Sequence, residues 1–150
     1  MDVRTLKDND LDDSDRRLIS DIETYGWHVV LIPEEDGTQG WAFSVGLYST
    51  FCKPEVIVFG LPQQVSPHLI NTVGMWARSV QTVSETDLYS GLIDKFQCTF
   101  RPVASQWYKY FVGAACWYYR RASFPLLQCF WPDRKEQFPW SPEFLASWLW

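Results

Sequence analysis

The stretch between Trp41 and Pro62 constrains the fold of this chain more than any other. From Trp41 to Gly46, large apolar residues alternate with small ones, which is the period of a strand buried on one face. Residues 56–59 then form an unbroken apolar run, as expected for a strand buried on both faces. Pro54 fits the start of this second strand because proline cannot donate to a sheet ladder. The stretch predicts two strands joined by a short turn, onto which the other elements pack.

The rest of the chain alternates between helical and extended patterns. Apolar stripes with a period of three to four residues predict helices at 15–25, 62–80, 106–121 and, with Ser141 as cap, 141–150. Apolar and β-branched runs bounded by turn residues predict strands at 27–32, 41–47, 56–59, 97–103 and 126–131. We therefore predict a single α+β domain over residues 1–150, with residues 1–10 flexible. Its mainly antiparallel central sheet is expected to have about five strands, flanked by about four helices.

Short polar segments mark the ends of these elements. Asp13 or Ser14 is expected to cap the first helix, and Gly26 is expected to end it. The loop 33–40 is rich in turn-forming residues and should reverse the chain into an antiparallel hairpin with an acidic, exposed tip. Residues 81–94 are polar and are expected to be irregular.

Aromatic content and charge set the expectations about function. The chain contains nine Trp, seven Tyr and ten Phe, which bury large areas in a core and also dominate the energetic centres of protein interfaces. The net charge is −5, and residues 1–94 carry 15 of the 18 acidic side chains. This charge argues against nucleic acid as the ligand and suits a basic protein partner. Alternatively, the negative charge is explained by a solvated surface that keeps the protein soluble.

The termini and apolar runs predict a cytoplasmic protein without membrane contact. The first residues lead into acids rather than into an apolar segment, and the longest apolar run, 111–119, is too short to span a bilayer. The four cysteines are scattered without ligand spacing and are expected to be buried thiols. His28 and His68 are the only histidines. We expect His28 to be a structural residue in a strand and His68 to be a surface residue on a helix. No metal and no cofactor is predicted.

Catalytic motifs are sparse in this sequence. There is no GxSxG elbow, no Walker loop and no GxGxxG. A dyad of Cys52 with a histidine is conceivable, but any chain with four Cys and two His offers such a combination. Glu55 and Asp133 lie beside prolines at strand ends, where carboxylates often accept backbone N–H groups. We expect that structural role for both, in preference to acid–base chemistry.

A series of short motifs follows one order along the chain. The residues are Gly26, Trp27, Gly46, Pro54, Glu55, Gly60, Pro62, Gln128, Trp131, Pro132, Asp133, Pro139 and Trp140. Together they resemble the bacterial domain of unknown function numbered 4262, over about residues 20–140. The family typically has Tyr-Thr where this chain has Phe43-Ser44, and often His where it has Lys53; the usual Gly after Asp133 is also missing. The resemblance implies a fold and structural roles for these residues, and no settled activity.

Three functions stay open at this point. The first is a cytoplasmic immunity protein that neutralises a cognate bacterial toxin, such as a nuclease, by occluding its active cleft. Its candidate partner-binding residues are Asp12, Asp13, Asp15, Glu34, Glu35, Asp36, Glu85, Asp87 and Tyr89. The second is a small enzyme or ligand-binding domain, with a pocket near Ser44, Lys53, Glu55 and Asp133. The third is a structural subunit that assembles through its aromatic C-terminal helix, and the oligomeric state is open.

Overall fold

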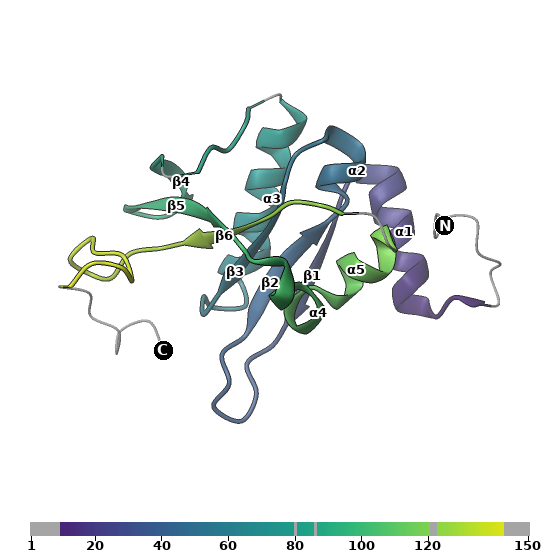
Figure 1. Cartoon of the computed structure of the whole chain (residues 1–150), viewed down its shortest axis with the longest axis horizontal. Helices are drawn as coiled ribbons and strands as arrows, with labels where there is room; N and C mark the ends of the chain where they lie inside the picture. The colour runs from purple at the N-terminus through teal and green to yellow at the C-terminus, as the bar shows by residue number, and fades with distance from the viewer. Residues whose placement is uncertain (1–9, 80, 86, 121–122, 143–150) are drawn as a thin grey trace.

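A six-stranded mixed sheet forms the centre of the computed structural model, which describes residues 10–79, 81–85, 87–120 and 123–142 (Figure 1). The strands are β1 (His28–Ile32), β2 (Trp41–Val45), β3 (Glu55–Phe59), β4 (Tyr89–Ile93), β5 (Phe96–Pro102) and β6 (Leu126–Phe130). Their order in the sheet is β1-β2-β3-β6-β5-β4, and all neighbours are antiparallel except β3 and β6. The predicted α+β class is confirmed, with one strand more than expected.

Helices cover both faces of the sheet. They are α1 (Asp13–Tyr25), α2 (Leu47–Phe51), α3 (Val65–Arg78), the 3₁₀ helix η3 (Ser105–Trp107), α4 (Tyr108–Phe111) and α5 (Gly113–Tyr119). On one face Leu69 of α3 belongs to the same buried cluster as Val58 of β3. On the other face Leu18 of α1 and Ala115 of α5 belong to a second buried cluster with Ile57 of β3. Because both sides are covered, β3 is buried along most of its length, as the apolar run predicted.

The cap of α1 is Asp12, which precedes both predicted candidates. The Asp12 carboxylate accepts a hydrogen bond from the Asp15 amide at 2.8 Å, and the Asp15 carboxylate accepts one from the Asp12 amide at 3.1 Å. This reciprocal pair is a capping box, with Asp where Glu or Gln is usual. The helix therefore begins at Asp13, so neither Asp13 nor Ser14 is the cap. Gly26 ends α1 with a φ of 103°, as predicted.

Two connections differ from the prediction. The link between β2 and β3 is not a short turn, because it contains the helix α2. Residues 81–94 are not irregular throughout, because β4 begins at Tyr89. The pairing of β4 with β5 shifts in register between Tyr89 and Ile93, and Gly91 has a φ of 92°. An interrupted strand lacks a regular alternation of side chains, so its sequence carries no clear strand signal.

The aromatic segment 106–121 is not one helix. It breaks at Val112, whose φ of −129° and ψ of 46° lie outside the helical region and whose side chain is fully buried. The break separates α4 from α5, so that Phe111 packs against Trp41 while Tyr118 joins the cluster beneath α1. The predicted helix from Ser141 to Trp150 and the predicted flexible N-terminus lie outside the described residues, apart from Asp10, Ser141 and Pro142.

The cysteines are not all buried thiols. Cys98 and Cys129 are buried in the core as predicted, whereas Cys116 is half-buried and Cys52 is exposed. Cys52 ends α2 with a φ of 58°, and this short turn keeps its side chain at the surface. His68 lies exposed on α3, and His28 pairs with Asp21 at 2.7 Å, in agreement with the structural roles predicted for both histidines.

The described residues were also searched for membrane spans and metal ligands. None of the helices found there is both long and apolar enough to cross a membrane. Over the same residues, no three His, Cys, Asp or Glu side chains converge in a way that would hold a metal ion.

Candidate functional site

Glu55, the first residue of β3, lies at the centre of a buried hydrogen-bond network. Its side chain is fully buried. Its carboxylate accepts hydrogen bonds from Ser44 Oγ at 2.7 Å, Gly46 N at 2.9 Å, Leu47 N at 3.2 Å, Tyr48 N at 3.2 Å and the Tyr119 hydroxyl. The three amides lie at the start of α2, where the cap residue is a glycine without a capping side chain. Glu55 therefore caps α2 from a different element of the fold.

The environment of Glu55 shifts two pKa values. Burial raises the pKa of the Glu55 carboxyl above its ordinary value, and hydrogen bonds from Tyr119, Ser44 and the backbone lower it part of the way back. Burial and the charge of Glu55 raise the pKa of Tyr119, so its hydroxyl stays protonated and remains a donor. A carboxylate offers about four lone-pair sites, and these donors occupy them. Glu55 has the geometry of a structural cap, with no acceptor site left for a substrate.

The pocket predicted near Ser44, Lys53, Glu55 and Asp133 does not form among the described residues. Ser44 and Glu55 are in contact, but the Lys53 amine donates to the hydroxyl of Thr82. Asp133 lies in the loop after β6, and its Oδ1 accepts hydrogen bonds from the backbone amides of residues 135 and 137 at 2.8 and 2.9 Å. Both carboxylates accept hydrogen bonds from backbone N–H groups, as expected for acids at strand ends.

The motif residues Trp27 and Gly46 hold α1, α2 and α3 together. The Trp27 indole donates to the side chain of Asn71 on α3 at 2.9 Å. Its ring lies so close to Gly74 that a Cβ there would come within 2.4 Å of it. Gly46 has a φ of 114°, and a Cβ there would come within 2.9 Å of the Gly26 carbonyl oxygen. These positions are explained by close packing.

The C-terminal motif residues fix the loop that follows β6. The Trp131 indole donates to the Phe59 carbonyl at 2.9 Å. The Trp140 ring stacks on Phe138 with 5.2 Å between ring centroids, and the Arg101 guanidinium lies 4.2 Å from the Trp140 ring centroid. These contacts tie the loop to β3 and β5, so they also have a structural explanation.

Gln128 differs from the other motif residues. It lies in the middle of β6, between Ile57 on β3 and Arg101 on β5. It lines an open cavity of about 460 Å³, which we call the hairpin groove. Within the part of the chain that the structure describes, no hydrogen bond of its amide is found. The structural role predicted for Gln128 therefore has no contact to support it, and its amide is available in the groove.

The hairpin groove lies between the sheet and the short helices η3 and α4. It is lined by Thr38, Gln39, Trp41, Ile57, Phe59, Val103, Trp107, Phe111, Leu126 and Gln128. Its central rings are fixed, because Phe111 meets Trp41 and Phe59 edge to face at centroid distances of 5.5 and 5.2 Å. The Trp41 indole also donates to the Phe111 carbonyl at 2.9 Å. The groove is thus an aromatic surface with a few polar groups, as is typical of binding sites.

The acidic hairpin tip is a tight, hydrogen-bonded turn that adjoins this groove. Glu35 and Thr38 exchange two backbone hydrogen bonds of 3.1 and 2.8 Å, and the residues between them, Asp36 and Gly37, have φ values of 48° and 78°. Positive φ at both central residues is the signature of a type I′ turn, which suits a two-residue hairpin. The turn holds Glu34, Glu35 and Asp36 exposed, beyond the body of the molecule (Figure 1).

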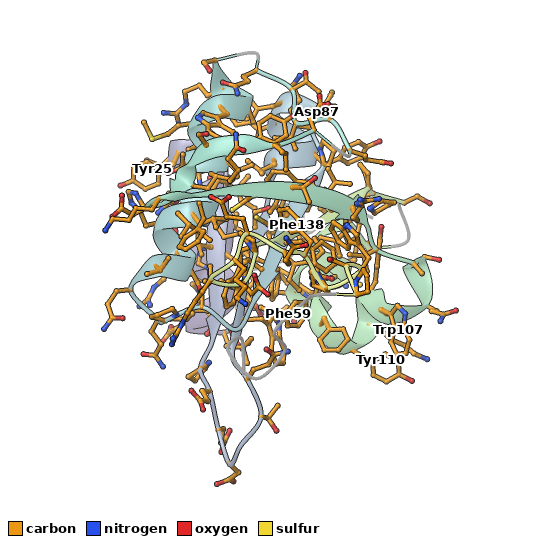
Figure 2. The ribbon with its side chains drawn as sticks, turned by 90° about the vertical axis from the view of Figure 1, so that its left-hand side faces the viewer. Tyr25, Phe59, Asp87, Trp107, Tyr110 and Phe138 are labelled. Carbon is orange, nitrogen blue, oxygen red and sulfur yellow. The ribbon has the colours of Figure 1, made fainter. Side chains whose placement is uncertain are left out.

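The nine predicted partner-binding residues do not form one surface. Asp12, Asp13 and Asp15 lie at the start of α1, where they cap the helix or pair with Arg16. Glu85, Asp87 and Tyr89 lie between α3 and β5, where the Tyr89 hydroxyl accepts a hydrogen bond from the Ser84 amide at 2.7 Å. Figure 2 shows Asp87 at one end of the molecule and the hairpin at the other. Asp15 and Glu85 line cavities elsewhere, whereas the hairpin acids lie within a few residues of Thr38 and Gln39, which line the hairpin groove.

Sequence reasoning missed the groove. Its lining comes from the hairpin, three strands and two short helices, and no local pattern brings these segments together. One signal was present, since Gln128 is a polar residue within the apolar run 126–131 of a central strand. Trp107 and Tyr110 are exposed, which the prediction of a single amphipathic helix over residues 106–121 did not anticipate.

Comparison with known proteins gives one match. The sequence model of a protein family described as "Domain of unknown function (DUF4262)" matches residues 21–145. No curated protein and no solved structure matches the chain. The matched residues contain the whole sheet and nearly all of the helices described above, and the match confirms the resemblance inferred from the motifs. The chain belongs to the family Domain of unknown function (DUF4262).

Proposed function

We propose that this protein is a cytoplasmic immunity protein, which binds a cognate bacterial toxin and neutralises it by occluding its active cleft. The observation that carries the proposal is the acidic tip of the β1–β2 hairpin. Glu34, Glu35 and Asp36 are exposed, and none of them makes an ion pair with another described residue. A cluster of unpaired negative charge fits a partner whose contact surface is basic.

The overall charge supports the same proposal. The net charge of −5 adds a long-range field to the local charge of the hairpin. Such a field attracts a basic partner and raises the rate of association, and salt screens it over about 10 Å at 0.1 M. A nuclease is one toxin of this kind, because a cleft that binds phosphates carries basic side chains.

Exposed aromatic side chains support a protein as the partner. Trp107 in η3 and Tyr110 in α4 are 47% and 62% exposed, and Figure 2 shows both at the periphery of the molecule. Trp and Tyr are enriched among the residues that contribute most to binding at protein interfaces. Trp107 also lines the hairpin groove, together with Thr38, which lies two residues after Asp36 of the acidic tip.

Co-expression tests the proposal directly. The product of the neighbouring open reading frame is expressed in cells with and without this protein, and growth and co-purification are measured. We expect growth inhibition by the neighbouring product alone, and both restored growth and a stable complex when the two are expressed together. Toxicity that persists in the presence of the protein, with no complex recovered, would contradict the proposal.

A further inference from the structure

We propose that the hairpin groove is the site of toxin contact, and that it takes a loop presenting one bulky apolar side chain flanked by lysine or arginine. This inference rests on the proposed function and adds to it the place and the chemistry of the contact. Three features of the groove carry the inference, namely its rings, its unpartnered amides and the charge at its border.

The rings provide the site for the apolar side chain. Phe111 packs edge to face against both Trp41 and Phe59, so the lining is preorganised and little side-chain entropy is lost when a partner binds. The sheet beneath them contributes Ile57 and Leu126, which are apolar. A volume of about 460 Å³ lies within the range of about 300–1,000 Å³ that is usual for binding pockets.

Two amide side chains favour a peptide over a purely apolar ligand. Gln39 Oε1 is buried without a hydrogen-bond partner among the described residues, and Gln39 lines the groove. The Gln128 amide lines the same groove and also lacks a partner there. An acceptor shielded from water is costly unless a donor reaches it. The backbone of a bound loop supplies donors and acceptors beside its side chain, so it satisfies both amides.

The negative charge of the hairpin tip, which lies beside the groove, favours a basic loop. Thr38 lines the groove, and Asp36 precedes it by only two residues, so their Cα atoms lie within about 7 Å of each other. A lysine or arginine next to the inserted side chain therefore reaches the acidic tip. The same charge disfavours two other occupants, because nucleic acid and a symmetric second copy of this chain would each place negative charge against it.

A peptide titration tests this assignment without the toxin. Isotope-labelled full-length protein is titrated with three blocked tripeptides, Lys-Trp-Lys, Gly-Trp-Gly and Glu-Trp-Glu, and the indole signals of Trp41 and Trp107 and the amide signal of Gln128 are followed by NMR. We expect Lys-Trp-Lys to shift these signals and to bind at least about tenfold more tightly than Glu-Trp-Glu at low salt, a preference that about 1 M salt removes.

Two matched variants distinguish the contribution of the hairpin charges to peptide binding from that of the net charge of the protein. The hairpin variant carries Glu34→Gln, Glu35→Gln and Asp36→Asn; the control variant carries Glu23→Gln, Glu136→Gln and Asp94→Asn, which remove as much charge from exposed positions elsewhere. The preference for Lys-Trp-Lys should fall in the hairpin variant and persist in the control variant. An equal loss in both variants, signal shifts away from the groove, or equal affinity for the three peptides would overturn the inference.

The result of the peptide titration does not depend on the result of the co-expression experiment described above. Selective binding of Lys-Trp-Lys in the groove, together with a failure of rescue, would contradict only the proposed function. Rescue by a protein whose groove signals do not respond to the peptides would overturn only the assignment of the contact site.

Discussion

The carboxylate of Glu55 and the three carboxylates of the hairpin tip are the same chemical group in opposite surroundings. Glu55 is fully buried and accepts hydrogen bonds from every donor around it, three of them backbone amides of one helix start. Glu34, Glu35 and Asp36 are exposed and make no ion pair within the described residues. A buried acceptor with all its sites filled serves folding, whereas an exposed and unpaired charge adds little to stability and is available to a partner.

The tryptophans show the same contrast. Trp27 is buried, its indole is bonded to Asn71, and its ring leaves no room for a side chain at Gly74. Trp107 is half exposed at the border of the groove and packs only loosely, with centroid distances of 6.2 and 6.5 Å to Tyr110 and Phe111. Burial and satisfied hydrogen bonds, rather than residue type, therefore separate structural residues from candidate binding residues in this protein.

The largest effect is expected from Glu55→Ala. Its backbone donors would stay buried without an acceptor, and α2 would lose its cap, so the free energy of unfolding should fall by about 3 kcal/mol or more. Urea denaturation measures this loss, with Glu23→Ala on the exposed face of α1 as a control expected to change stability by less than about 0.5 kcal/mol. A loss below about 1 kcal/mol for Glu55→Ala would contradict the capping role.

A pair of glycine substitutions sharpens the contrast between core and surface. A Cβ at Gly74 would come within 2.4 Å of the Trp27 ring, so Gly74→Ala should cost about 1–3 kcal/mol through overpacking. A Cβ at Gly113 would meet no atom within 4 Å, and Gly113→Ala should leave stability unchanged or raise it by about 0.5–1 kcal/mol. Thermal unfolding compares the two variants, and equal effects would be inconsistent with the packing described here.

A smaller effect is expected in the pH dependence of stability. Burial raises the pKa of Glu55 above its ordinary value of 4.5, so the folded protein binds this proton more tightly than the unfolded chain does. The contribution of Glu55 to the free energy of unfolding therefore decreases as the pH rises from 4.5 through the folded-state pKa. Glu55→Gln removes this titration. The stability of the wild type minus that of Glu55→Gln should shrink with rising pH, and a growing difference would show that the hydrogen bonds outweigh burial.

The smallest effect on stability is expected from the hairpin variant. Its three substitutions remove exposed charges without partners, and asparagine tolerates the positive φ of Asp36 as readily as aspartate does. The free energy of unfolding should stay within about 0.5 kcal/mol of the wild type. Urea denaturation checks this, and a loss like that of Glu55→Ala would mean that the hairpin acids are structural after all.

The sequence predicted the parts of the fold that follow from local pattern. The alternation from Trp41 and the apolar run to Phe59 predicted the central strands, and the prolines beside Glu55 and Asp133 pointed to carboxylates that cap backbone groups. Features set by long-range packing were not predictable. The helix predicted over residues 106–121 is interrupted at Val112, whose side chain is fully buried, and the local pattern did not mark that position.

The candidate site was less predictable than the fold. The acidic hairpin tip was expected, because a Pro-Glu-Glu-Asp-Gly segment between two strands is a turn. The groove beside it was not, because it is closed by residues from Thr38 to Gln128 that only the folded sheet brings together. The position of Asp87 at the far end of the molecule also depends on tertiary structure (Figure 2).

Growth rescue by the two charge variants shows whether the hairpin acids bind the partner. Cells that express the neighbouring product together with the wild type, the hairpin variant or the control variant are compared at equal levels of folded protein. We expect the wild type and the control variant to restore growth, and the hairpin variant to restore it weakly or not at all. Equal rescue by the hairpin and control variants would contradict the claim that the acidic hairpin is the partner-binding region of this protein.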